Sequence, residues 1–260
     1  MRRIVRGRPH PALAGLVKGY ADFAERADGP RETGGVPGRC VVVIVDLDTG
    51  WTVEGERFGS FAGGLYARPV RVRHEGSSAG VQIDLEPPSV RTLLGVPAGE
   101  LAQRTVGLEA LLGDEAERIG ERLHGARSAA ARFKLLDEVL RRRVAGFPIA
   151  SRHPDLERAW ALLRQSGGRL RIEQLAEKLG CSRRHLAKRF AEDVGAPPKL
   201  AARLMRFEAA RAALGAMPLA RLAAEHGYSD QAHLAREFAA LGGAPPTLFP
   251  FLQDAGAAEA

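Results

Sequence analysis

An imperfect internal repeat in the second half constrains this chain of 260 residues more than any other feature. The first copy is LAEKLGCSRRHLAKRF at positions 175–190, and the second is LAAEHGYSDQAHLAREF at positions 222–238. The copies are offset by 47 positions at their starts (175 to 222) and by 48 at their ends (190 to 238). The second copy therefore holds one additional residue in or near its turn, and one supersecondary unit has been used twice.

Each copy is typical of a helix-turn-helix. Gly180 and Gly227 supply the positive φ at which the first helix ends, and Ser182 and Ser229 are placed to cap the second helix. The second helix of such a unit enters the major groove of DNA. The segment 198–214 follows Pro197-Pro198 and is expected to be a linker helix of about 25 Å. Such a spacer suits two recognition helices about one turn of DNA apart, ~34 Å.

These motifs resemble those of the AraC/XylS family of bacterial transcription regulators. GYSDQAHLAREF at 227–238, followed by GAPP at 243–246, is similar to the C-terminal signature of that family, and the linker pattern from Pro198 through Arg206 to Ala210 also matches. The resemblance covers about 155–250. It implies two helix-turn-helix units that contact adjacent major grooves, and an N-terminal domain that senses a small molecule or dimerises.

The resemblance also assigns contact positions. In both recognition helices these are residues near the N-terminus: Arg183, Arg184, Ala187 and Lys188 in the first, and Gln231, Ala232, His233 and Arg236 in the second. Arginine and lysine commonly bind guanine, and glutamine binds adenine. Many family members have a polar residue where this chain has the two alanines, so these contact a thymine methyl or nothing. For His233, as for His185, the alternative is local hydrogen bonding. Arg206 is expected to form an internal ion pair.

The first half has a different pattern. Short β-branched or alternating runs between 39 and 86 predict a small antiparallel sheet or barrel, and helical periodicity follows over 89–146. Segment 11–26 is either a short helix or an extended entry. The predicted fold is thus an α+β two-domain chain: a sheet or cupin-like barrel with trailing helices, then an all-α domain with two helix-turn-helix units joined by a linker helix.

No metal site or cofactor is expected. A metal cupin needs a His-x-His pair with further ligands, and the strand region holds only His74, which is expected on the surface. The aromatic residues of this region, Trp51, Phe58, Phe61 and Tyr66, either pack in a core or line an apolar pocket. The apolar face of segment 114–146 either packs on the sheet or forms a dimer. The arginines at 141–143 are expected to face water.

Charge and composition limit the class of protein to which this chain can belong. The formal net charge is +7, of which residues 151–250 carry +6 (16 basic, 10 acidic). This concentration favours a polyanionic partner for the helical half. The two cysteines, Cys40 and Cys181, are too far apart in sequence for a CxxC site, and no run of 18 apolar residues predicts a membrane span. A cytoplasmic protein without a membrane partner is expected.

The predicted organisation is a sensor or dimerisation domain over 1–148, a DNA-binding domain over 149–252 and a tail over 253–260. Within the DNA-binding domain the units span about 172–192, 198–214 and 219–241. The predicted function is a sequence-specific transcription regulator, not an enzyme, whose partner is double-stranded DNA. A small-molecule effector, a second copy of the chain and, for an activator, RNA polymerase are further expected partners. The alternatives are an effector-free or partner-dependent DNA-binding protein and an enzyme, such as an alkyl-transfer repair protein, fused to a DNA-binding module.

Overall fold

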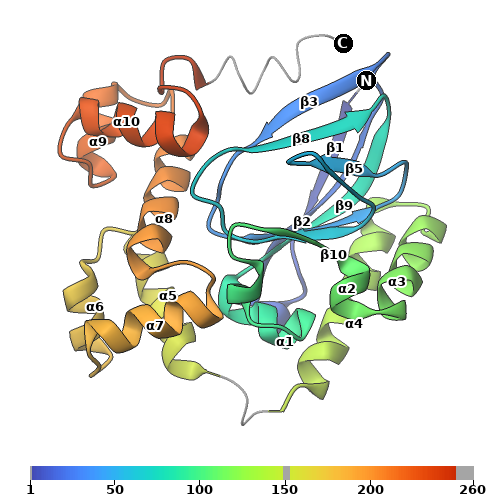
Figure 1. Ribbon diagram of the computed structural model, residues 1–260, viewed down its shortest axis with the longest axis horizontal. Helices are drawn as coiled ribbons and strands as arrows, with labels where there is room; N and C mark the ends of the chain where they lie inside the picture. The colour runs from blue at the N-terminus through green and yellow to red at the C-terminus, as the bar shows by residue number, and fades with distance from the viewer. Residues whose placement is uncertain (1, 149–152, 250–260) are drawn as a thin grey trace.

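The computed structural model describes residues 2–148 and 153–249 and has a mixed α/β half and an all-α half (Figure 1). An N-terminal sheet region with trailing helices lies beside a C-terminal helical domain, so the predicted two-domain α+β class is confirmed. The expected tail over 253–260 falls outside the described residues, as do 149–152 at the expected boundary between the domains.

The strands form two antiparallel sheets. The six-stranded sheet has the order β1-β2-β9-β4-β7-β10, and the four-stranded sheet has the order β3-β8-β5-β6. Their bounds are β1 Arg2–Gly7, β2 Val17–Glu25, β3 Pro30–Gly35, β4 Val41–Asp46, β5 Trp51–Val53, β6 Glu56–Phe58, β7 Phe61–Gly63, β8 Val70–Glu75, β9 Ser78–Leu85 and β10 Thr105–Gly107. Ile44, Val53, Phe61, Tyr66 and Val70 form an apolar cluster, with Trp51 and Phe58 packed against it. The aromatic side chains of this region thus pack in a core.

The sheet begins earlier than the sequence pattern predicts. Strands β1, β2 and β3 all precede residue 39, and segment 11–26 contains a short 3-10 helix, η1 (Pro11–Leu13), followed by β2. β2 pairs with β1 on one side and with the distant β9 on the other. The pairing with β9 comes from a strand about sixty residues away, so β2 forms although its own sequence has little alternation of polar and apolar residues.

The helices of the first half cover the six-stranded sheet. They are η2 Pro87–Ser89, α1 Val90–Leu94, η3 Ala98–Leu101, α2 Leu108–Leu112, α3 Asp114–Gly125 and α4 Ala129–Gly146. The apolar residues of α3 and α4, among them Ile119, Leu136 and Leu140, share one core with Val43, Val81 and Ile83 of the sheet. Of the two uses expected for this apolar face, packing on the sheet is the one observed.

Two further expectations for the first half are wrong. The helical pattern expected over 89–146 is interrupted, because β10 pairs with β7 and Gln103 has a φ of 56°, which breaks the helical run. His74 is not on the surface but only 3% exposed. Its ring lies edge-on to Trp51 with centroids 5.4 Å apart, because β8 turns this position toward the space between the sheets.

The C-terminal half contains α5 Pro154–Gln165, α6 Ile172–Lys178, α7 Arg183–Asp193, α8 Pro198–Ala212, α9 Leu219–Glu225 and α10 Gln231–Gly242. α8 connects the α6–α7 pair to the α9–α10 pair (Figure 1). One core joins all six helices and includes the repeat residues Leu186 and Phe190 and their counterparts Leu234 and Phe238. Leu65 from the first half, 1% exposed, also belongs to this core.

Candidate DNA-binding interface

The first unit is formed by α6 and α7. Gly180 has a φ of 64°, which ends α6, and the Ser182 hydroxyl accepts a hydrogen bond from the His185 backbone N–H at 3.1 Å. Both features agree with the sequence prediction. At the start of α6, Gln174 accepts a hydrogen bond from the Arg171 N–H at 3.4 Å. The cap at Ser182 defines where α7 begins and therefore which residues occupy its first turns.

The second unit, α9 and α10, has a different cap from the one predicted. Gly227 has the expected positive φ of 75°, but the side chain that caps α10 is Asp230, which accepts from the His233 N–H at 2.6 Å. The additional residue of the second copy explains the difference, because Asp230 lies 48 positions after Ser182 whereas Ser229 lies 47 after it. The His233 N–H, with help from the Ser229 hydroxyl, holds the pKa of Asp230 below its usual range. The cap therefore stays ionised at neutral pH.

The residues assigned to DNA contact on α7 are exposed. Arg183, Arg184, Ala187 and Lys188 all face solvent. Arg183 lies 3.0 Å from Glu173 and Lys188 lies 3.8 Å from Glu192, so both have carboxylate partners within the protein. Arg184 has no hydrogen bond or ion pair within residues 2–148 and 153–249, and it is the more available guanidinium.

On α10, Gln231, Ala232 and Arg236 are exposed. His233 is half-buried, and its Nδ1 accepts a hydrogen bond from the Ser229 N–H at 3.3 Å while its ring lies edge-on to Tyr228 with centroids 5.3 Å apart. The local bonding considered for His233 is thus present, and it engages Nδ1 of the ring.

Two arginines of the linker helix α8, Arg203 and Arg206, bond within the protein. Arg206 does not form the expected ion pair; its guanidinium donates to the Gly168 carbonyl at 2.8 Å. The ion pair belongs to Arg203, whose Nε and Nη2 donate to Glu237 of α10 at 3.0 and 2.8 Å. The two arginines lie one helical turn apart, so the arginine that forms the ion pair is only three positions before the one predicted to form it.

A buried carboxylate links the two domains, and the sequence pattern did not reveal it. Glu86, at the end of β9 and 2% exposed, accepts from Arg39 at 2.5 Å and from the Trp160 indole N–H of α5 at 2.6 Å. Glu208 of α8 accepts from Lys18 and from the Arg39 backbone N–H at 3.1 Å. Burial alone would raise the pKa of Glu208, but the charges of Lys18 and Arg39 outweigh it and lower that pKa. We call Lys18, Arg39, Glu86, Trp160 and Glu208 the interdomain network.

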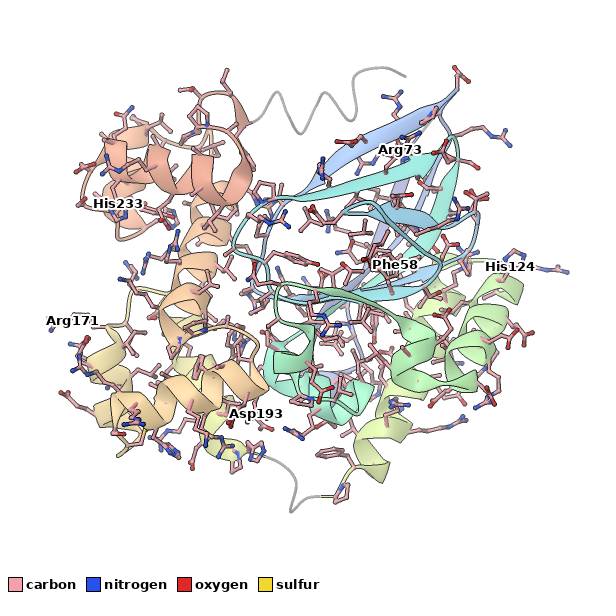
Figure 2. The ribbon with its side chains drawn as sticks, in the orientation of Figure 1. Phe58, Arg73, His124, Arg171, Asp193 and His233 are labelled. Carbon is pink, nitrogen blue, oxygen red and sulfur yellow. The ribbon has the colours of Figure 1, made fainter. Side chains whose placement is uncertain are left out.

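A second contact joins the first half to the recognition helix itself. Asp193, at the end of α7, accepts from Arg91 of α1 at 2.8 Å, and Figure 2 shows Asp193 at the end of α7 that approaches the first half. η3 packs on the same helix end so closely that a Cβ at Gly99 would lie 2.3 Å from the Glu192 carbonyl oxygen. The position of α7 is therefore set partly by the N-terminal domain.

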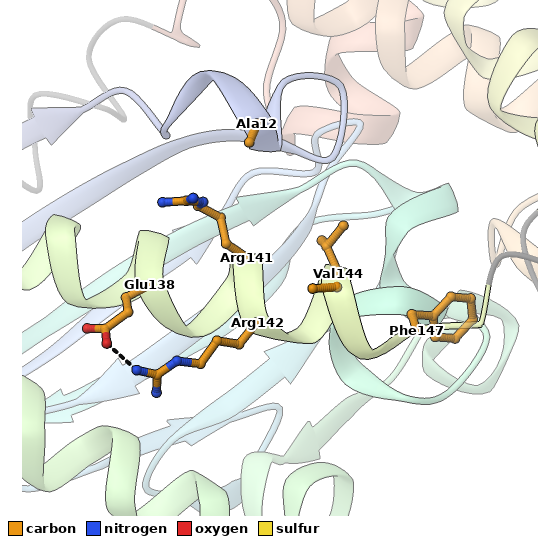
Figure 3. Close-up of a pocket in the computed structure, with 7 residues that line it drawn as sticks. Ala12, Glu138, Arg141, Arg142, Val144 and Phe147 are labelled. Carbon is orange, nitrogen blue, oxygen red and sulfur yellow. Dashed lines mark hydrogen bonds and ion pairs between the residues drawn. The ribbon is translucent and has the colours of Figure 1, made fainter.

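An open recess of about 650 Å³ runs along the last turns of α4, beside η1 (Figure 3). Arg142 pairs with Glu138 along its edge, and Arg141 projects from α4 near Ala12. Arg143 departs from the expectation that all three arginines face water, since it donates to Glu115 and to the Leu93 carbonyl, both at 2.5 Å. None of the residues assigned to DNA contact lines this recess.

Comparison with known proteins agrees with this geometry. Residues 175–249 match the family model described as a helix-turn-helix domain. A crystal structure of apo ToxT from Vibrio cholerae, a variant form, is similar with a TM-score of 0.52 and 10% sequence identity, covering 90% of this chain and 97% of that one. A second structure of ToxT from Vibrio cholerae gives a TM-score of 0.50 and 9% identity over 96% and 98% of the two chains. No curated protein sequence matches significantly.

Residues 175–249 are therefore a helix-turn-helix domain, on a chain whose overall fold is similar to that of ToxT. In the residues that the structure describes, no helix combines the length and apolar character needed to cross a membrane.

Proposed function

We propose that this DNA-binding transcription regulator recognises a two-part operator through α7 and α10 and responds to a small molecule held by its N-terminal domain. The observation that carries the proposal is the pair of capped recognition helices with exposed base-reading side chains, Arg184 and Lys188 on α7 and Gln231 and Arg236 on α10. Arginine and lysine at such positions bind guanine O6 and N7, and glutamine binds adenine.

The two contacts between the domains support a response to an effector. The interdomain network and the Arg91–Asp193 pair connect the sheet domain to α5, α7 and α8. A ligand that binds one arrangement of these contacts more tightly than another shifts the population of DNA-binding states.

A homodimer is a further part of the proposal, and it would use a surface other than the apolar face of α3 and α4, which packs on the sheet. Contact with RNA polymerase follows if the protein activates, and the cytoplasm is the proposed location.

The alternative hypothesis of an alkyl-transfer enzyme has weak chemical support. Such an enzyme needs a cysteine thiolate in an activating environment. Cys40 is 7% exposed, and burial raises the pKa of its thiol, so the nucleophilic form is suppressed at neutral pH.

The test is selection of binding sites from random duplexes by the full-length protein, followed by mapping of bound sites across the genome of the source organism. Enrichment of one motif at moderate salt is the expected result, with affinity at least about 10³-fold above that for random duplex. Equal affinity for selected and random duplexes would refute sequence-specific regulation. The genes beside the mapped sites would then supply candidate effectors, and a rise in melting temperature with one of them tests the sensor role. No rise with any such compound supports an effector-free regulator instead.

A further inference from the structure

The loop that precedes the first unit contacts the linker helix and the second unit at once. Arg206 of α8 donates to the Gly168 carbonyl at 2.8 Å, which ties the α5–α6 loop to α8. Arg203, one turn earlier, holds α10 through Glu237. Neighbouring turns of α8 therefore bond to the loop before the first unit and to α10 of the second unit.

The approach of this loop to α8 allows no side chain at Gly168. The residue is buried with a φ of 73°, and a Cβ there would lie 2.1 Å from the Ala202 carbonyl oxygen on α8. Glycine alone accepts both the positive φ and this distance. The loop and the linker helix are thus in direct backbone contact.

Arg169 extends this contact to the turn of the second unit. Its Nη1 donates to the Glu225 carbonyl at the end of α9, at 3.3 Å. A Cβ at Gly227 would lie 3.0 Å from Cγ of Arg169 and 3.6 Å from Cδ of Arg206. The loop before the first unit, the linker helix and the turn of the second unit therefore meet around one point.

α8 is joined to the two units through the turns that contain Gly195 and Gly215, with φ of 76° and 82°. The hydrogen bond from Arg169 to the Glu225 carbonyl adds a second connection, which does not run through the linker helix. Recognition depends on this geometry, because one base pair between half-sites changes their relative rotation by roughly 35° and their separation by ~3.4 Å.

We propose that Gly168, Arg169 and Arg206 are positioning residues that fix the separation of α7 and α10, and so the half-site spacing that the protein accepts. We call these three residues the brace. The inference rests on the proposed function, since it concerns how the same two helices read an operator. The brace contributes rigidity between the units rather than contacts to bases.

The experiment is selection from a random duplex library by full-length wild type, Arg169→Ala, Arg206→Ala and the control Arg211→Ala. Arg211 lies on the same helix and makes no hydrogen bond or ion pair with any described residue, so its variant matches the loss of charge. Arg169 is exposed, which makes its variant the milder one, and melting curves establish that each protein is folded. Affinities are then measured for the selected site and for the same site with one base pair inserted between its halves.

Wild type and Arg211→Ala should select one spacing and lose at least about tenfold in affinity on insertion, whereas the brace variants should select several spacings and lose less than about threefold. A reduced affinity with unchanged spacing in both folded brace variants would overturn the inference while leaving the proposed function intact. Failure of the wild type to enrich any motif would overturn the proposed function and the brace together.

Discussion

Removal of the Glu86 carboxylate is the perturbation whose magnitude the structure defines best. Glu86→Ala leaves the Trp160 indole N–H buried without a partner, and it leaves the Arg39 guanidinium without its closest anion. Deleting one partner of a buried ion pair costs about 3–5 kcal/mol. Arg39 retains Glu208 at 3.6 Å, so we expect the lower end, about 3 kcal/mol.

The assay is urea unfolding followed by tryptophan fluorescence in a Trp51→Phe background, where Trp160 is the remaining indole and reports on the interface. In thermal unfolding, about 3 kcal/mol corresponds to a fall in Tm of roughly 6–12 °C for a chain of this size. Because the carboxylate lies between the domains, the variant should also separate the unfolding of the two domains into distinct transitions.

Glu138→Ala is the matched control, since Glu138 is an exposed carboxylate whose partners Arg122 and Arg142 also face solvent. Exposed pairs contribute about 0–1 kcal/mol. A loss below about 1 kcal/mol for Glu86→Ala, equal to that of the control, would show that the carboxylate does not couple the domains.

Three further outcomes are expected. Arg184→Ala should relax specificity in one half-site by about 1–3 kcal/mol if the contact is bidentate, and an unchanged selected motif would contradict its assigned role. Ser182→Ala removes the cap of α7 and should lower the free energy of unfolding by about 1 kcal/mol in urea titrations; Ser182→Asp, which keeps an acceptor, should restore it. The pKa of Glu208 is lowered from its usual value of about 4.5, so its contribution is complete above pH 4.5 and is lost as the pH falls through the lower, folded-state pKa. The Tm difference between wild type and Glu208→Gln should therefore stay constant from pH 8 to about 5.5 and shrink below about 4.5; a difference that already changes near pH 7 would exclude this carboxylate as the cause.

The repeat made the helical domain predictable because its information is local. A glycine with positive φ and a capping hydroxyl act within one or two residues of where they stand, so the end of α6 and the start of α7 follow from Gly180 and Ser182 alone. The predicted cap of α10 was wrong because the extra residue of the second copy moves the capping position from Ser229 to Asp230. This error is also local in origin. The exposure of Arg184 and Arg236 also follows from helix periodicity.

The sheet domain was harder to predict because its pairings are distant. β2 forms hydrogen bonds with the distant strand β9, and His74 is buried because the two sheets enclose it. Neither feature can be inferred from the residues next to β2 or His74 in the sequence. The strand pattern over 39–86 covered β4 to β9 and missed β1, β2, β3 and β10.

The sequence by itself thus determined a duplicated DNA-binding unit, its turns and the residues that its recognition helices expose. Only the tertiary structure decided which residues connect that unit to the rest of the chain. Glu86 and Glu208 link the domains because the two domains enclose them, and Gly168 must be glycine because α8 packs directly against it. The physical reason is that turns and caps depend on neighbours in the chain, whereas a buried charge or a missing Cβ depends on whatever the fold brings against it.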